Sequence, residues 1–90
     1  MPRVVVPPPY RGPTGGREEI DVEGASVREC LHAVERRFPG FGPQVLDAGG
    51  RLHRFVSLFV NGEELDRAAL DAAVAPGDRL EILAAIGGGA

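Results

Sequence analysis

The chain has 90 residues, a length that fits a single domain with one modest core and little room for an enclosed active site. Its net charge of -3, with no basic cluster beyond Arg36-Arg37, argues against nucleic-acid binding, and the lack of a long apolar run argues against a membrane span. The N-terminus shows no signal-peptide pattern and Cys30 is the single cysteine, so we expect a cytoplasmic protein without nucleic-acid or membrane partners.

The N-terminal segment predicts two strands joined by a long loop. Residues 3–6 form a short apolar run typical of a strand buried on both faces, and Pro7-Pro8-Pro9 ends it because proline has no backbone donor for a strand ladder. Residues 18–22 alternate between acidic and apolar side chains, which indicates a half-buried strand. We therefore expect a hairpin around the loop of residues 10–16.

One main helix is predicted after residue 26. Ser26 and Glu29 match the capping-box pattern, in which each side chain accepts a hydrogen bond from the other residue's backbone N–H. The apolar residues that follow recur at helical spacing and form one stripe: Val27, Cys30, Leu31, Val34 and Phe38. Because Cys30 lies on this stripe, we interpret it as a buried structural cysteine and not as a nucleophile. Pro39-Gly40 ends the helix, and residues 43–46 are expected to add a short helical turn.

The C-terminal half predicts a second hairpin and a final strand. Residues 55–60 form a strand, and Asn61-Gly62 is typical of a hairpin turn because both turn positions need a positive φ. The remaining predicted segments are, in order, a short return strand at residues 63–65, a brief helical turn at residues 66–73, a turn at Pro76-Gly77-Asp78 and a last strand at residues 79–83.

This order of elements predicts an α+β fold of the β-grasp, or ubiquitin-like, type. Two hairpins flank the main helix, which packs on one face of a mixed sheet of four to five strands. A right-handed crossover places the last strand parallel to the first, in the middle of the sheet. We expect residues 1–86 to form this domain and residues 87–90 to form a flexible tail.

Phe55 and Phe59 lie on the same side of their predicted strand and are candidates for docking a partner protein. An exposed apolar patch on the sheet face opposite the helix would mark such a site. In the alternative arrangement both phenylalanines fill the core, while Val56, Leu58 and Val60 face outward.

The chain ends in Gly87-Gly88-Gly89-Ala90, directly after an apolar run. Consecutive glycines lose the most backbone entropy on ordering, so they contribute little to stability. They offer a thin tail that can enter a slot too narrow for a Cβ atom, with a carboxylate at its tip. A frayed terminus is the simpler interpretation, and a C-terminus that is itself a substrate is the functional one.

Four stretches and this glycine tail carry a resemblance to a known family. The stretches are Thr14-Gly15-Gly16, residues 52–56 (LHRFV), residues 60–65 (VNGEEL) and Pro76-Gly77-Asp78. The order of the predicted elements and the glycine tail together resemble the ThiS/MoaD ubiquitin-like sulfur carriers. The four stretches resemble, within that family, the CysO-type carriers of cysteine biosynthesis. The resemblance implies a protein co-substrate and not an enzyme. Its C-terminal glycine is adenylated by an ATP-using, ubiquitin-activating-enzyme-like adenylyl/sulfurtransferase and becomes a thiocarboxylate.

The resemblance also implies further partners. A PLP-dependent cysteine synthase that uses O-phosphoserine would accept the sulfur, and a zinc metallopeptidase would release cysteine. Donation to molybdopterin, thiazole or thiosugar synthesis stays open, as do a ubiquitin-like protein modifier and a non-covalent interaction module. We expect the carrier alone to be a monomer without bound cofactor. We also expect no bound metal, because His32 and His53 have no partners at metal-ligand spacing.

The tip departs from the family pattern, which usually ends in a Gly-Gly carboxylate. Here Ala90 follows the three glycines. We expect a metallopeptidase to remove Ala90 so that Gly89 becomes the activated residue, with Gly88 beside it and Gly87 in the part that threads into the partner.

Overall fold

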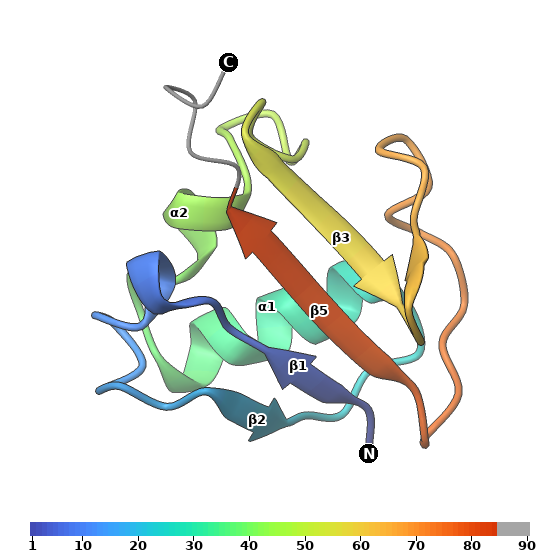
Figure 1. Ribbon diagram of the computed structural model, residues 1–90, viewed down its shortest axis with the longest axis horizontal. Helices are drawn as coiled ribbons and strands as arrows, with labels where there is room; N and C mark the ends of the chain where they lie inside the picture. The colour runs from blue at the N-terminus through green and yellow to red at the C-terminus, as the bar shows by residue number, and fades with distance from the viewer. Residues whose placement is uncertain (85–90) are drawn as a thin grey trace.

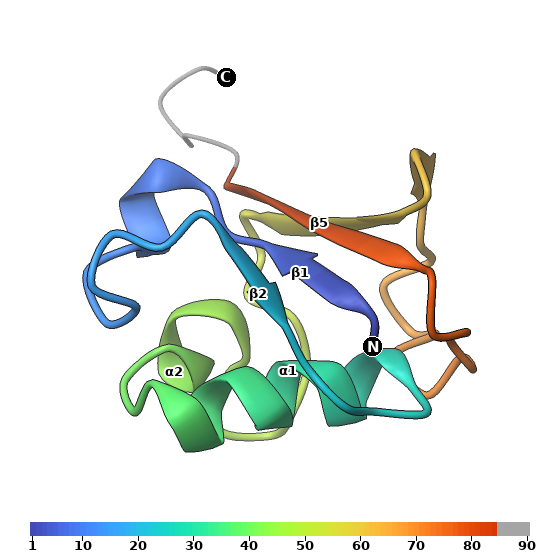
Figure 2. The same cartoon turned by 90° about the horizontal axis from the view of Figure 1, so that it is seen from below.

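The computed structural model describes residues 1–84, which contain five strands and three helical segments joined by loops. The strands are β1 (Arg3–Val5), β2 (Glu19–Asp21), β3 (Val56–Val60), β4 (Glu63–Glu64) and β5 (Arg79–Ala84). The helices are the 3-10 helix η1 (Pro8–Tyr10), α1 (Val27–Arg37) and α2 (Gly42–Val45). The strands form one sheet in the order β2-β1-β5-β3-β4, and α1 lies across one face of it (Figure 1, Figure 2).

The strand pairing confirms the predicted β-grasp order. β1 is antiparallel to β2 and parallel to β5, while β3 is antiparallel to both β4 and β5. The last strand therefore lies in the middle of the sheet, where its backbone groups find partners on both sides. The predicted tail at residues 87–90, and the end of the predicted domain at residue 86, lie outside the described residues.

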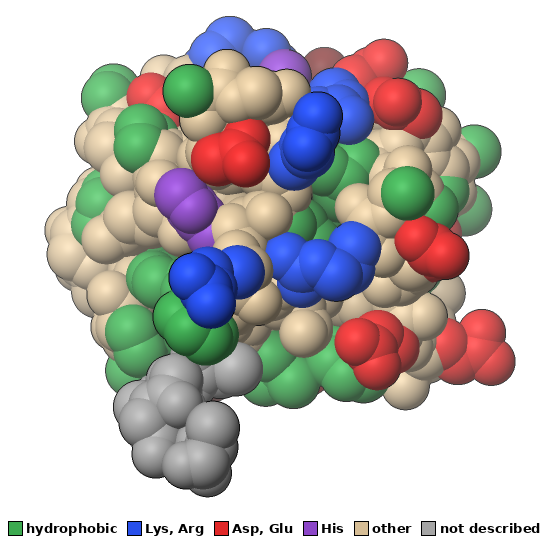
Figure 3. Space-filling view, turned by 90° about the horizontal axis from the view of Figure 1, so that it is seen from above, with side chains coloured by type: hydrophobic (Ala, Val, Ile, Leu, Met, Phe, Trp, Pro, Cys, Tyr) green, Lys and Arg blue, Asp and Glu red, His purple; other side chains and the backbone are tan. Residues whose placement is uncertain are grey.

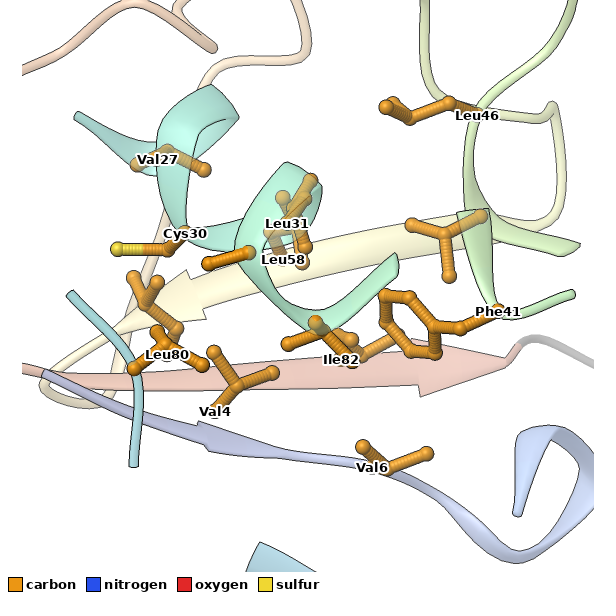
Figure 4. Close-up of a cluster of buried hydrophobic side chains, with 14 of the residues drawn as sticks. Val4, Val6, Val27, Cys30, Leu31, Phe41, Leu46, Leu58, Leu80 and Ile82 are labelled. Atoms are coloured by element: carbon orange, nitrogen blue, oxygen red, sulfur yellow. The ribbon is translucent and has the colours of Figure 1, made fainter. Parts of the chain in front are cut away.

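The hydrophobic core lies between α1 and the sheet (Figure 4). The buried residues of α1 are Val27, Cys30, Leu31, Ala33 and Val34. The sheet meets them with Val4, Ile20, Leu58, Leu80 and Ile82, each at most 2% exposed. Full burial confirms the interpretation of Cys30, and desolvation raises the pKa of its thiol, which favours the unreactive protonated form.

The first turn of α1 is capped by two side chains. Ser26 Oγ accepts a hydrogen bond from the Glu29 N–H at 3.1 Å, as the capping-box pattern predicts. The Glu29 carboxylate, however, accepts from the Ala25 N–H at 2.9 Å and not from Ser26. The reciprocal half of the predicted box is therefore displaced by one residue.

The predicted helical turn at residues 66–73 is wrong. The segment forms successive turns, the first closed by a 2.9 Å hydrogen bond from the Ala69 N–H to the Asp66 carbonyl. The Leu70 carbonyl accepts a 2.8 Å hydrogen bond from the Arg28 N–H, in the first turn of α1. Because the first N–H groups of a helix have no partner within it, pairing with α1 replaces a local helix in this segment.

The second hairpin is tied to the turn that precedes β5. Asn61 and Gly62 have φ angles of 52° and 87°, which confirms the predicted turn. Asn61 Nδ2 donates to Asp78 Oδ1 at 3.0 Å, and Asn61 Oδ1 accepts from the Arg79 N–H at 3.0 Å. Asp78 also accepts from the Ala75 N–H at 2.8 Å, and this bond, followed by the one from Asn61, lowers the pKa of the Asp78 carboxyl.

The Asp78 contacts predict a pH-dependent stability. A carboxyl whose pKa is lowered by folding stabilises the fold above its unfolded pKa of about 3.9, and this contribution is lost as the pH falls through the folded value. We expect Asp78→Asn to lower the urea midpoint at pH 7 and to weaken the loss of stability at acidic pH. Glu23→Gln, which removes an exposed carboxylate in the segment between β2 and α1, is the control and should keep the wild-type profile. Parallel pH profiles for wild type and Asp78→Asn would contradict this account.

Candidate functional site

β5 delivers the C-terminal segment from the centre of the sheet. It pairs with β1 through residues 79–81 and with β3 from Val60↔Leu80 to Val56↔Ala84. The last described residue of β5 therefore lies next to the first residue of β3 (Figure 1). The predicted activation residues Gly88 and Gly89, the threading residue Gly87 and Ala90 all lie outside the described residues, so their roles remain predictions.

An apolar surface lies on the sheet face opposite α1. Phe55, one residue before β3, is 47% exposed, and Leu83 of β5 is 51% exposed. Phe59 is half-buried on the same side of the sheet, because it alternates with the buried Leu58. The apolar surface is defined here as Phe55, Phe59 and Leu83. Docking through Phe55 and Phe59 requires that their side chains be at least partly exposed, as they are here. The docking role itself stays a prediction.

The alternative arrangement of this strand is wrong. Val56 is 1% exposed and Leu58 is fully buried, while Val60 packs against the core. These side chains face α1 because α1 covers only that face of the sheet (Figure 2).

Leu83 was not among the predicted docking residues. Its signal was present in the alternation of β5, since inward Leu80 and Ile82 place the next residue on the outer face. The signal was masked by the continuous apolar run that follows Glu81, in which no polar residue marks the outward positions.

The remainder of the outer face carries charge. Arg3 of β1 contacts Asp21 at 2.9 Å and Glu19 at 3.0 Å, and Arg79 contacts Glu19 at 3.4 Å. The hydrogen bond from Arg3 lowers the pKa of the Asp21 carboxyl. β1 was predicted to be buried on both faces, but Arg3 is exposed and Val5 is half-buried because no helix covers this side. The ion pairs occupy the part of the outer face around β1 and β2, away from Leu83 near the end of β5.

Arg67 holds the backbone of the segment that carries Phe55. Its guanidinium donates to the carbonyls of Leu52 at 3.1 Å and His53 at 2.5 Å, and also to the carbonyl of Val56. His53 is fixed further, since its Nε2 lies 2.8 Å from the Pro43 carbonyl oxygen. No local sequence pattern marks this role of Arg67, because its acceptors lie more than ten residues earlier in the chain.

The side chains that could bind a metal ion are scattered within residues 1–84. Within residues 1–84, no three His, Cys, Asp or Glu side chains are grouped so that they could hold a metal ion. The same residues include no helix long and apolar enough to span a membrane.

We expect Arg67→Gln to loosen residues 52–56 and to lower the free energy of unfolding by about 1–3 kcal/mol, because carbonyls lose charge-assisted partners. Arg67→Lys keeps the charge but not the planar set of donors, so its loss should be intermediate. Urea unfolding and amide hydrogen exchange of residues 52–56 measure both effects.

Arg36→Gln is the matched control, since Arg36 is exposed on α1 and should change stability by no more than about 0.5 kcal/mol. Wild-type stability and exchange in Arg67→Gln would show that Arg67 does not hold this segment.

The fold and the exposed surface at the end of β5 define a ubiquitin-like β-grasp protein. The ThiS family profile matches residues 4–89, and the chain belongs to the ThiS family. It is 33% identical over 89 residues to the sulfur carrier protein CysO of Mycobacterium tuberculosis, a match that covers 96% of each chain.

Two solved structures agree with this assignment. A chain of the Amycolatopsis orientalis BexX/CysO complex is 35% identical with a TM-score of 0.88, and the match covers 96% of this chain and 97% of that chain. Mycobacterium tuberculosis CysO is 30% identical with a TM-score of 0.87, and the match covers 96% of this chain and 100% of that chain. The predicted resemblance is confirmed, and the protein is a sulfur carrier of the CysO type. CysO-like sulfur carriers are small carrier proteins and not enzymes.

Proposed function

We propose that the protein carries sulfur as a thiocarboxylate on Gly89 and donates it for cysteine formation from O-phosphoserine. The observation that carries this proposal is the glycine run at residues 87–89, three residues after the end of β5, in a chain that matches CysO over nearly its whole length.

The chemistry begins with an unreactive carboxylate. The terminal carboxylate attacks ATP in the activating partner, which releases pyrophosphate and leaves an acyl adenylate. Hydrogen sulfide then forms a C–S bond at the acyl carbon, AMP departs with the electron pair of the C–O bond, and a proton is released. A persulfide donor would need a thiol reductant in addition. The partners supply the catalytic groups, and the carrier supplies a tethered sulfur at high effective concentration.

The later steps belong to two further partners. In a PLP-dependent cysteine synthase the thiocarboxylate sulfur takes the place of the phosphate group of O-phosphoserine. A zinc metallopeptidase then hydrolyses the product, which releases cysteine and restores the carboxylate. The same class of peptidase removes Ala90 before the first cycle. The carrier acts in the cytoplasm as a monomer.

The tail is tested by sulfur transfer in vitro. We expect the chain without Ala90 to gain sulfur when incubated with ATP, an activating enzyme and sulfide, as seen by intact-mass analysis. Deletion of residues 88–90 should abolish this gain, because no glycine remains at the position that the partner activates. Gly77→Ala, a glycine change in the turn before β5, serves as the control and should accept sulfur like the wild type.

The protein from its native host provides the matching measurement. Intact mass should show a population that lacks Ala90, and fully retained Ala90 in active material would contradict the trimming step. A ladder of high-mass conjugates on an immunoblot would favour a protein modifier. Activity that survives deletion of residues 88–90 would favour a non-covalent module.

The apolar surface is tested by association with the activating enzyme. We expect Phe55→Ala combined with Leu83→Ala to weaken binding by about 2 kcal/mol or more, because exposed apolar anchors lose their contacts in the partner. Both side chains are about half exposed in the free protein, so unfolding should change little. Met1→Ala, which alters another exposed apolar side chain at 61% exposure, should bind like the wild type. Unchanged affinity of the double variant would exclude this surface.

A further inference from the structure

Four arginines gather on one end of the molecule. Arg28, Arg51 and Arg67 line a hollow of about 390 Å³, and Arg54 belongs to the same loop as Arg51. Figure 3 shows several arginine side chains around a hollow with hydrophobic atoms in its floor. These four residues are called the arginine surface here. They come from α1, from the loop before β3 and from the turn after β4, so only the fold brings them together.

Two guanidinium groups of the arginine surface, those of Arg51 and Arg54, have no direct ion pair within residues 1–84. The Asp47 carboxylate, however, accepts from the Arg51 backbone N–H at 3.0 Å and lies near the charge of that residue. Arg28 is paired with Asp71 at 2.9 Å, whereas Arg67 donates to neutral carbonyls. For Arg51 and Arg54, residues 1–84 provide no carboxylate within ion-pair distance of the guanidinium.

Arg3, Arg11 and Arg79, on the opposite part of the surface, each have such a partner. Arg17, Arg36 and Arg37 also have no ion pair within residues 1–84, and Arg17 and Arg37 lie over the Phe38 ring. The arginine surface is distinguished by its position next to Phe55 and the end of β5.

The arginine surface is continuous with the apolar surface. The Arg54 guanidinium carbon lies 5.1 Å from the centre of the Phe55 ring, a distance typical of a cation–π contact. Phe55 precedes Val56, which pairs with Ala84 at the end of β5. A protein that receives the C-terminal segment from β5 therefore passes beside Phe55 and Arg54.

We propose that the arginine surface binds an acidic segment of the partner protein that receives the C-terminal tail, with Arg51 and Arg54 as the contact residues. Carboxylates of that segment pair with the two guanidinium groups, and an apolar side chain of the same segment packs on Phe55. The identity of the partner rests on the proposed function, while the affinity for carboxylates does not.

The charge pattern favours an acidic protein segment over a nucleic acid. Glu64 and Asp66 flank Arg67 and bound the arginine surface on one side. A phosphodiester backbone continues past so small a cationic area and meets the remainder of an acidic protein. A peptide with a few carboxylates needs no more area than Arg51 and Arg54 provide.

The first experiment does not use the partner. The 15N-labelled protein is titrated with a synthetic hexaglutamate peptide and, separately, with a short oligothymidylate. We expect hexaglutamate to shift the amide signals of residues 50–55, and Arg51→Gln with Arg54→Gln to abolish the shifts. Equal shifts around Arg3 and Arg79, no shifts, or tighter binding of oligothymidylate at the arginine surface would overturn the proposal.

The second experiment measures association with the activating enzyme at about 50 and 200 mM NaCl, two concentrations at which the Debye length differs about twofold. We expect Arg51→Glu with Arg54→Glu to weaken binding at least about tenfold at low salt, and Arg51→Gln with Arg54→Gln to weaken it less and to flatten the salt dependence. Arg17→Glu with Arg36→Glu makes the same change in net charge elsewhere and should bind within about twofold of the wild type.

The outcomes separate the two proposals. Wild-type affinity in the Glu and Gln variants, with sulfur transfer intact, overturns the role of the arginine surface and leaves the proposed function standing. Failure of the wild type to gain sulfur overturns the proposed function, and the hexaglutamate titration then decides the carboxylate affinity by itself. Thermal unfolding of each variant identifies any that does not fold, and the Gln pair replaces the Glu pair in that event.

Discussion

The pairing of β5 on both sides is the constraint on which the rest of the structure depends. Its parallel contact with β1 joins the first hairpin to the end of the chain, and its antiparallel contact with β3 joins the second hairpin to the same strand. Leu80 and Ile82 then face α1, and burial of each contributes about 1.5–3 kcal/mol. Because β5 is hydrogen-bonded to a strand on each side, the position of its last residue is fixed relative to the sheet.

The two faces of the sheet differ because α1 covers one of them and leaves the other open. The covered face is filled by the core, and the open face is divided along β5 into a charged part around Arg3 and Arg79 and an apolar part at Leu83. Ion pairs at the surface add little stability, but they keep the charged part hydrated and unattractive to apolar partners. On the strands themselves, the exposed large apolar side chain is Leu83, close to the end of β5.

The loop before β3 connects these properties. Arg67 and the contacts of His53 fix its backbone, so Arg54 and Phe55 are presented from a defined frame at little conformational cost. In the proposed function, one small surface would meet several different enzymes. A rigid patch with an apolar part and a cationic part gives each partner two kinds of contact and a defined orientation.

The sequence by itself determined the order of elements, the hairpin turn at Asn61-Gly62, the Ser26 cap and the buried stripe of α1, because these follow from side-chain periodicity and local backbone stereochemistry. It also displayed the glycine run, which together with the family resemblance indicated a carrier. It did not determine the form of residues 66–73, because their carbonyls pair with the first turn of α1 instead of forming a local helix. Only the tertiary structure decided that Phe55 and Leu83 share an open face, that Arg67 holds the loop before β3, and that four arginines meet at one end. These are contacts between residues far apart in the chain, and packing alone sets which of them become neighbours.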